Sequence, residues 1–371
     1  MKLNYKLGEL IRNIDVKNKD LHCNNLKGLS MTKEFRASTS NIVGTDISKY
    51  KIVAYKQFAC DFMSAIRVHK MPIAFNSEME EILVSPAYAV FEVIDENIIL
   101  PEYLMMWFRR SEFDRYADFR SDAAIRGGYG WNELCETEIK LPSLEEQRKK
   151  VQAYKTITDR IELKKKINDN LLDSVQAIFR SWFVDYDPFD GVCPSNWETG
   201  CVEDIAEFFD SMRKPLSSLE RTDMERIYPY YGAVSIVDYV DDYIFDGEYL
   251  LVSEDGIYVV DENGHPLIQH ISGKFWANNH AHILKGKSGF NEDSLYLFLA
   301  NTNMAPIVTG AAQPKINQAN LKSFPITIPD SETMLKFNNI IQPFFDQRLT
   351  NESEIKKLEA LQSLLLTRLV D

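Results

Sequence analysis

Two long segments of the chain repeat their hydrophobic residues at the period of an α-helix. In the first, residues 144–186, seam positions recur at alternating steps of four and three, which predicts a helix with one face packed on a partner helix. At about 1.5 Å per residue, such a helix is a rod roughly 60 Å long, longer than a small domain core requires. The seam consists of Ile157, Ile161, Lys164, Asn168, Leu171, Val175, Ile178 and Trp182.

The second segment, residues 331–371, carries a looser apolar stripe, interrupted by Arg348 and Asn351. Polar seam residues such as Asn168 and Asn351 lower the stability of a helix pair but can fix its register. We expect the two segments to pack on each other as antiparallel coiled-coil helices. The stripe consists of Leu335, Ile341, Phe344, Ile355, Leu358, Leu361, Leu365 and Leu369.

The two segments are also copies of each other. The likeness extends upstream, because Leu141-Pro142-Ser143 corresponds to Ile328-Pro329-Asp330. Each helix is thus entered through a proline step and a Ser or Asp cap, followed by an acidic first turn. Two unrelated surface helices are the alternative, which the upstream likeness disfavours. Aligning LDSVQAIFRSWFVD with LEALQSLLLTRLVD matches Leu172, Val175, Gln176, Phe179 and Val184 with Leu358, Leu361, Gln362, Leu365 and Val370.

The rest of the chain forms two β-rich blocks, residues 1–143 and 187–330. In each block we expect strands, then one helix, then a loop and a short segment ending at a proline. This order occurs twice and predicts an α+β fold with a pseudo-twofold repeat: two mixed α/β domains separated by the two long helices. The expected strands are 51–55, 81–85, 88–94, 248–253, 257–260 and 266–271, the expected helices are 101–119 and 291–299, and Asn263-Gly264 signals a hairpin.

Composition narrows the class of protein. A hydrophobic content of 45% over 371 residues is enough for more than one buried core. The sequence has no apolar run long enough to span a membrane and no signal peptide, and its five cysteines contain no CxxC pair. We therefore expect a cytoplasmic protein with reduced thiols.

Catalytic motifs are scarce. His280 and His282 share one face of a strand, but without a third ligand nearby in the sequence a structural role is favoured over a metal site. The glycines after Arg126 do not link a strand to a helix, so they are a poor phosphate cradle. Asp187-Pro188-Phe189 lacks the second proline of the amino-methyltransferase tetrapeptide and is interpreted as a helix stop. We expect no enzymatic activity in this chain.

Binding chemistry is better represented, in loops that mix cations, amides, glycines and aromatic residues. Arginine pairs with guanine, and asparagine or glutamine with adenine, in the major groove, while glycine lets the backbone approach a phosphate. For any single position, an exposed polar loop residue is an equally good interpretation. The net charge of -13 argues against a simple basic nucleic-acid binder, although a groove can be basic on an acidic protein. The candidate DNA-binding residues are Lys33, Arg36, Asn41, Arg126, Gly127, Gly128, Tyr129, Trp131, Arg213, Lys214, Lys274, Asn278, Asn279, Gln313, Lys315 and Asn317.

Over nearly its whole length the chain resembles the specificity (S) subunit of type I restriction-modification enzymes. The resemblance rests on stretches that occur in the family's order in each half. In the first half they include GLSMTKEFRAS, RGGYGWNEL, LPSLEEQRKK and SWFVDYDPFDG, and in the second half GKFWANNHAHIL, TGAAQPKINQANL and the final leucine-rich helix.

The resemblance implies two target recognition domains (residues 1–143 and 187–330), each reading half of a split sequence in double-stranded DNA, with two spacer helices (144–186 and 331–371). It also implies partners: two methyltransferase (M) subunits and restriction (R) subunits, which use S-adenosylmethionine, ATP and Mg, while this chain binds no cofactor or metal. The complex methylates adenine at N6 after flipping the base. Candidate contacts with the M subunits, or between the helices themselves, are Phe179, Trp182, Phe183, Leu364 and Leu366.

Two other functions are compatible with the residues. The first is a non-catalytic adaptor or acidic DNA mimic that occupies such a complex without reading DNA; salt-sensitive binding to one particular duplex would argue against it. The second is the recognition part of a single-chain enzyme, which the absence of a methyltransferase motif disfavours.

Overall fold

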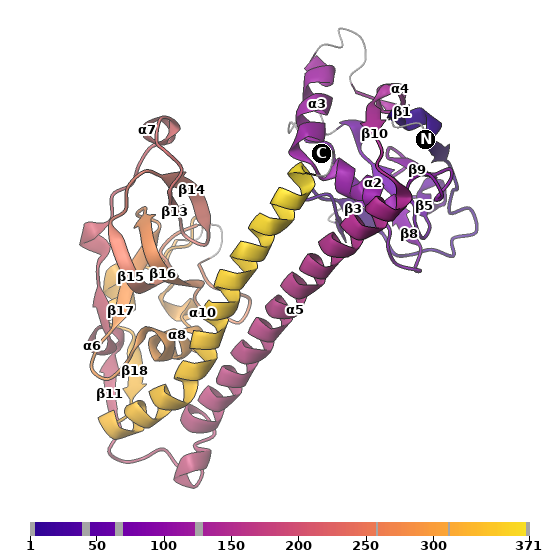
Figure 1. Ribbon diagram of the computed structural model, residues 1–371. Helices are drawn as coiled ribbons and strands as arrows, with labels where there is room; N and C mark the ends of the chain where they lie inside the picture. Colours follow the sequence, from indigo (N-terminus) through magenta and orange to yellow (C-terminus); the bar gives the residue numbers. More distant parts are fainter. Residues whose placement is uncertain are drawn as a thin grey trace. The chain divides into compact units, whose positions relative to one another are not determined.

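The computed structural model describes residues 4–38, 45–63, 70–122, 129–256, 259–310 and 312–368. The chain divides into two compact units: unit 1 comprises Met1–Lys164 and Ser353–Asp371, and unit 2 comprises Lys165–Glu352. Both long helices, α5 (Leu144–Phe183) and α10 (Ser331–Thr367), contribute to both units (Figure 1). Within the described ranges, no helix has the length and apolar character that crossing a membrane requires.

Unit 1 is built on a four-stranded antiparallel sheet with the order β2-β9-β6-β7. Phe58 and Phe91 stack across neighbouring strands of this sheet with ring centroids 4.9 Å apart, and both are fully buried. Three two-stranded ladders complete the strands. The strands are β1 (Asn4–Lys6), β2 (Ile11–Ile14), β3 (Lys27–Leu29), β4 (Phe35–Ala37), β5 (Lys51–Val53), β6 (Phe58–Cys60), β7 (Ile73–Phe75), β8 (Ile82–Val84), β9 (Ala89–Val93) and β10 (Glu138–Lys140).

The single helix expected over residues 101–119 is two helices, so that prediction is wrong. The segment forms α2 (Pro101–Phe108) and α3 (Ser111–Asp122), and α4 (Trp131–Glu136) follows. The buried Lys33 ammonium donates to the main-chain carbonyl of Phe108, which terminates α2. A continuous helix would need that carbonyl for its own ladder.

Unit 2 contains a six-stranded sheet with the order β12-β17-β15-β16-β13-β14. β15 is buried on both faces, because Leu250 and Val252 lie in one core cluster while Tyr249 and Leu251 lie in another. Helix α8 (Glu292–Ala300) packs on β15, β16 and β17. The strands and the other short α-helices of unit 2 are β11 (Glu198–Cys201), α6 (Val202–Ile205), β12 (Ala206–Phe208), α7 (Ser218–Thr222), β13 (Tyr228–Tyr231), β14 (Ile236–Val240), β15 (Phe245–Ser253), β16 (Ile268–Ala277), β17 (Ala281–Gly286), α9 (Gln318–Lys322) and β18 (Pro325–Ile328).

The hairpin signal at Asn263-Gly264 is confirmed as a tight turn. Asp261 N donates to His265 O at 2.8 Å, and Gly264 adopts a positive φ of 84°. Of the strand expected over 257–260, residues 257 and 258 lie outside the described residues, and Val260 forms an isolated bridge with Pro266.

The repeat expected from the sequence is present in the order and pairing of the elements. In the first half, β1 pairs antiparallel with β10, and α5 begins four residues after β10. In the second half, β11 pairs antiparallel with β18, and α10 begins three residues after β18. A short helix precedes the closing strand in each half, α4 in the first and α9 in the second. The fold is thus an α+β repeat in which the first and last strands of each half meet before a long helix.

Both long helices begin with the caps that the sequence predicts. Ser143 and Glu146 form a reciprocal capping box, with Ser143 N donating to Glu146 Oε2 at 3.0 Å. At α10, Asp330 Oδ1 accepts from Thr333 N at 3.1 Å. Capping satisfies donors that have no partner inside the helix.

The two helices pack antiparallel within each unit. In unit 2, Asn351 Nδ2 donates to Asn168 Oδ1 at 2.8 Å, and both side chains are buried. In unit 1, Gln362 Nε2 donates to Thr158 Oγ1 at 2.8 Å. Higher numbers on α10 therefore oppose lower numbers on α5, as an antiparallel pair requires.

Candidate nucleic-acid interface

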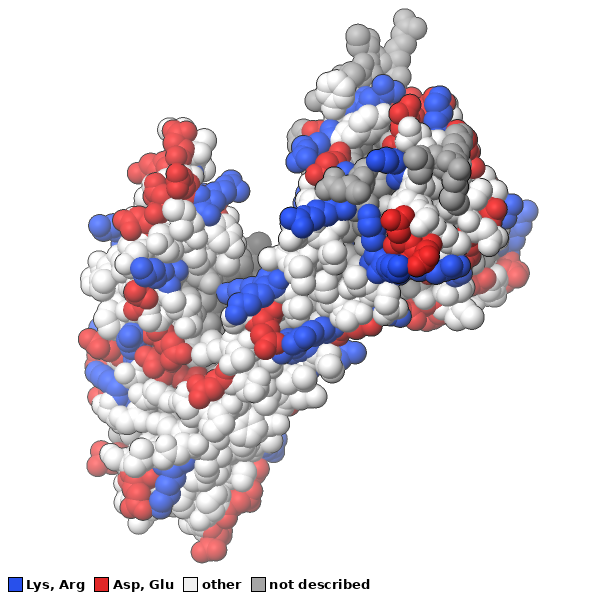
Figure 2. Space-filling model, in the orientation of Figure 1, with Lys and Arg blue, Asp and Glu red and all other residues white. Residues whose placement is uncertain are grey.

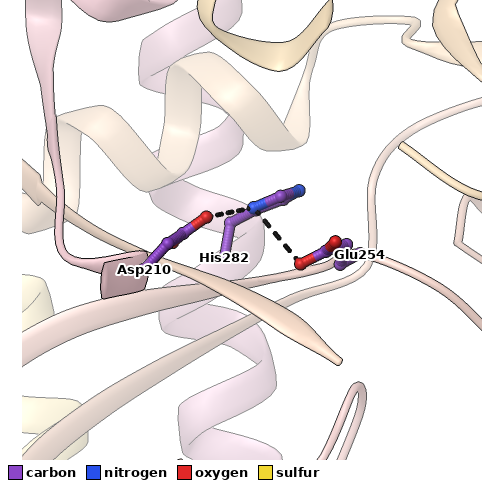
Figure 3. A group of neighbouring side chains, drawn as sticks. All are labelled: Asp210, Glu254 and His282. Carbon is purple, nitrogen blue, oxygen red and sulfur yellow. Dashed lines mark hydrogen bonds and ion pairs between the residues drawn. The ribbon is translucent and has the colours of Figure 1, made fainter. Parts of the chain in front are cut away.

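Three ionisable side chains of unit 2 lie together beside the central strands of the sheet. Asp210 opens a short 3₁₀ helix, η4 (Asp210–Met212), Glu254 directly follows β15, and His282 lies in β17. The side chains point toward one another, with His282 Nδ1 2.6 Å from Asp210 Oδ2 and 3.7 Å from Glu254 Oε2 (Figure 3). His282 is fully buried, so this is an interior polar cluster.

Hydrogen bonding fixes the protons on the His282 ring. Its Nε2 lies 2.8 Å from the main-chain carbonyl of Ile316, which can only accept. Burial disfavours the ionised form of Asp210, but bonds from His282 and the Ile283 amide, with the charge of Arg213, outweigh it and lower the pKa of Asp210. The Nε2–H of His282 therefore donates to the Ile316 carbonyl, while its Nδ1 faces the Asp210 carboxylate.

Two cations bind the Glu254 carboxylate, and an amide binds Asp210. Arg213 Nη1 lies 2.6 Å from Glu254 Oε2, and Lys315 Nζ lies 2.9 Å from Glu254 Oε1. Gln318 Nε2 donates to Asp210 Oδ2 at 2.7 Å. Burial raises the pKa of Glu254, but hydrogen bonds from Arg213 and Lys315 reverse the shift and lower it overall. We call these residues the Glu254 network: Asp210, Arg213, Glu254, His282, Lys315 and Gln318.

The network has the chemistry of a structural ion cluster. Asp210, Glu254 and His282 each offer a ligand atom, all within 4.8 Å of one another. A metal ion would need these lone pairs, yet protein N–H groups already point at the carboxylates and both nitrogens of His282 already have oxygen partners in the protein. This arrangement fits the structural role expected for His282 better than a metal site.

The network joins three surface segments of unit 2. Residues 213–214 follow η4, residues 278–280 connect β16 to β17, and residues 312–317 precede α9. Each segment exposes a polar side chain, Lys214, Asn279 and Gln313 respectively. The Glu254 network thus connects three segments, distant in the sequence, that expose one cation and two amides.

Charged residues elsewhere on unit 2 are mixed in sign. Figure 2 shows acidic side chains gathered over the α7 end of the unit, with basic side chains beside them. There, Asp238 holds Arg221 at 3.0 Å and Arg226 at 3.8 Å. On β16, the Lys274 ammonium lies 4.3 Å from the centre of the Tyr243 ring.

Comparison with known proteins finds sequences similar to parts of this chain. Residues 194–361 match the model of the type I restriction modification DNA specificity domain. A putative type I restriction enzyme specificity subunit of Haemophilus influenzae is 39% identical over 128 residues, which are 34% of this chain and 32% of that protein. A type I restriction enzyme specificity subunit of Methanocaldococcus jannaschii is 24% identical over 303 residues, covering 75% of this chain and 70% of that protein.

Residues 194–361 thus match the DNA specificity domain of type I restriction-modification systems, and the chain is similar to a specificity subunit over 75% of its length. The match to the Haemophilus influenzae protein spans about a third of that relative's length. The solved structure of an S subunit from M. genitalium shares the fold, with a TM-score of 0.55, 13% identity, and coverage of 99% of this chain and 96% of that one.

The candidate DNA-binding residues of unit 2 have different surroundings. Lys214, Lys274, Asn279 and Gln313 are exposed. Arg213 and Lys315 have their charged groups paired with Glu254. Asn278 is buried and accepts from His280 N at 2.8 Å, while Asn317 caps α9 by accepting from Asn320 N. Contacts between these residues and DNA stay predictions.

In unit 1 the candidates are more dispersed. Lys33 is 4% exposed and lies 2.8 Å from Asp114, and burial lowers the pKa of its ammonium. Tyr129 is a core residue whose hydroxyl lies 3.0 Å from Thr137 Oγ1, and Trp131 packs on the same core. Arg36 is exposed on β4. The remaining candidates lie outside the described residues: Asn41, Arg126, Gly127 and Gly128.

The residues expected to contact methyltransferase subunits also differ in exposure. Phe179 is 6% exposed and packs on Phe298 within the core of unit 2, so its side chain belongs to the unit's own interior. Trp182 and Phe183 are half-buried in the same cluster. On α10, Leu366 packs on the core of unit 1, while Leu364 is 45% exposed. Leu364 is the most accessible of the five.

Three network residues were not among the sequence candidates. Asp210 directly follows two phenylalanines, and Glu254 follows an apolar run after one serine, which is a weak sign of a buried carboxylate. Gln318 is separated from Asp210 by 108 positions, and no local pattern connects them.

Proposed function

We propose that this chain is a type I specificity subunit that reads a two-part DNA sequence, one part with each unit, and directs a methyltransferase to it. The observation that carries the proposal is the meeting of three polar segments on unit 2. Lys214 supplies a cation for a phosphate or a guanine edge, and the Asn279 and Gln313 amides match the hydrogen-bonding edge of adenine. The match of residues 194–361 supports it, since the matched family model is that of a DNA specificity domain.

The proposal includes the partners. Two methyltransferase subunits bind along α5 and α10, restriction subunits join them, and these partners use S-adenosylmethionine, ATP and Mg. Exposed leucines on the helices, Leu163 at 58% and Leu364 at 45%, support such docking, since large exposed apolar side chains mark interaction surfaces. The net charge of -13 is compatible if the methyltransferase subunits supply much of the phosphate contact.

Methylation mapping tests the proposal. The full chain is co-expressed with a cognate type I methyltransferase subunit, and N6-methyladenine is located genome-wide by single-molecule sequencing. We expect a split motif with two defined half-sites and a fixed unspecified gap. Absence of methylation, or one continuous motif, would contradict the proposal and favour an adaptor that does not read DNA.

Two substitutions localise the reading surface on unit 2. Gln313→Ala and Asn279→Ala each remove an exposed amide, and we expect each to relax one half-site by about tenfold, since one bidentate base contact is worth about 1–3 kcal/mol. Asn196→Ala removes an exposed amide outside the three segments and serves as the matched control. An unchanged motif in both variants would remove these segments from the reading surface.

A further inference from the structure

We infer that Glu254 is a positioning residue for sequence recognition by unit 2, and that Arg213 and Lys315 act through it instead of contacting DNA with their charged groups. The inference rests on the proposed function. On charge alone, Arg213 and Lys315 would be expected to contact DNA phosphates.

Glu254 binds all three segments of the candidate surface. Its carboxylate accepts from Arg213 of the first segment at 2.6 Å and pairs with Lys315 of the third at 2.9 Å. Its main-chain N–H donates to His280 O of the second segment at 2.9 Å, and its carbonyl accepts from Ile316 N at 2.9 Å. One residue therefore sets the relative positions of segments separated by up to a hundred positions in the sequence.

Arg213 and Lys315 are engaged by protein groups. The Arg213 side chain is 13% exposed, and its Nη1 also donates to Ala281 O at 2.6 Å and to the carbonyl of the exposed Asn279 at 3.5 Å. Lys315 exchanges two main-chain hydrogen bonds of 2.8 Å with Thr309, which closes the loop that carries Gln313. A guanidinium held by a carboxylate and a carbonyl fixes the backbone around it.

In this arrangement, the residues that position the loops differ from the residues that contact the bases. Base recognition needs donors and acceptors placed to within a fraction of an ångström. Removing the Glu254 charge frees Lys315 and leaves Arg213 with its carbonyl partners, so the sheet persists while the loops lose their common anchor. The expected effect is lower discrimination at one half-site, and not loss of the fold.

The experiment uses the full chain in complex with the methyltransferase subunit and maps methylation for Glu254→Gln and Lys315→Met. We expect methylation of sites mismatched in one half-site to rise about tenfold relative to the cognate motif, with the other half-site and the gap unchanged. Lys315 is 44% exposed, so its variant is expected to fold even if the Glu254 variant does not. Glu254→Asp keeps the charge and should restore part of the discrimination.

Asp238→Asn is the matched control. Asp238 also holds two arginines in unit 2, and Arg221 resembles Arg213 in exposure, at 14%, and in donating to a main-chain carbonyl at 2.6 Å. Equal relaxation in this variant, or an unchanged motif with only a lower methylation level in Glu254→Gln and Lys315→Met, would overturn the inference. A wild-type complex without any split motif would instead refute the proposed function on which the inference rests.

Discussion

At the scale of single residues, the pKa values of two neighbouring buried groups of unit 2 are shifted in opposite directions. Burial, together with the charge of Arg348, lowers the pKa of His270 to about 4. Burial raises the pKa of Asp293 to about 7, although its oxygen lies 3.6 Å from His270 Nδ1. The charged groups around Asp293 that contribute to its shift are Glu248 of β15, Glu292 of α8, and Asp346 and Arg348 of α10.

Replacing Asp293 with asparagine is expected to stabilise the protein at neutral pH. The folded state keeps the Asp293 proton up to about pH 7, whereas an unfolded aspartate loses it near pH 3.8. Stability is therefore lost as pH rises through this window, and an amide has no such loss. We expect Asp293→Asn to gain about 4 kcal/mol at pH 7.5 and almost nothing near pH 4.

Thermal unfolding at the two pH values measures this difference, with the exposed Asp223→Asn as the control. A gain that is the same at both pH values would show that Asp293 is not held protonated in the folded protein.

Sequence alone located the charged residues of the loops but not their surroundings. Lys33 and Arg36 lie three positions apart in one polar stretch, yet Lys33 is buried against Asp114 while Arg36 is exposed. The difference comes from α3, whose position depends on contacts about eighty positions away. No local pattern reports such a contact, and the same holds for Glu254 and its partners.

At the scale of elements, the seam between α5 and α10 in unit 2 contains a hydrogen-bonded pair of buried amides. Asn351 Nδ2 donates to Asn168 Oδ1, and Gln347 donates in turn to Asn351 Oδ1 at 3.1 Å. Such a pair stabilises the two helices less than apolar packing would. It favours one register, because a shift of one helix along the other leaves both amides without hydrogen-bond partners.

The single substitution is expected to lower the free energy of unfolding, and the double substitution is not. Asn351→Leu leaves the Asn168 amide buried without its partner and should cost about 1–3 kcal/mol of unfolding free energy. Asn168→Leu combined with Asn351→Leu replaces both and should be at least as stable as the wild type. Thermal unfolding compares the variants, with the exposed Asn170→Leu on α5 as the control. A double variant as unstable as the single one would exclude this role for the pair.

The elements were predictable where the signal is local. Ser143 and Asp330 mark the starts of α5 and α10 because side-chain caps act within one turn. The break between α2 and α3 was not predictable, because the ammonium that takes the Phe108 carbonyl comes from Lys33, 75 positions away.

At the scale of the whole molecule, the repeat supplies the two similar halves that the proposed reading of a two-part DNA sequence requires. Each unit has its own buried core, and each half closes with a strand pair that leads into a long helix. Pairing of β1 with β10, and of β11 with β18, was not readable from hydrophobic periodicity, since strand partners more than a hundred positions apart leave no local pattern. The order of elements was readable because the sequence itself repeats.

The central claim is that each unit reads its own half of the DNA sequence, and a domain exchange tests it most directly. Residues 1–143 hold every described strand of unit 1 and helices α2 to α4. They are replaced by the corresponding segment of a family member with a known split motif, and methylation is mapped in the methyltransferase complex. The account predicts that one half-site changes to that of the donor, while the other half-site and the gap stay the same. An unchanged motif, or a change in both halves, would contradict it.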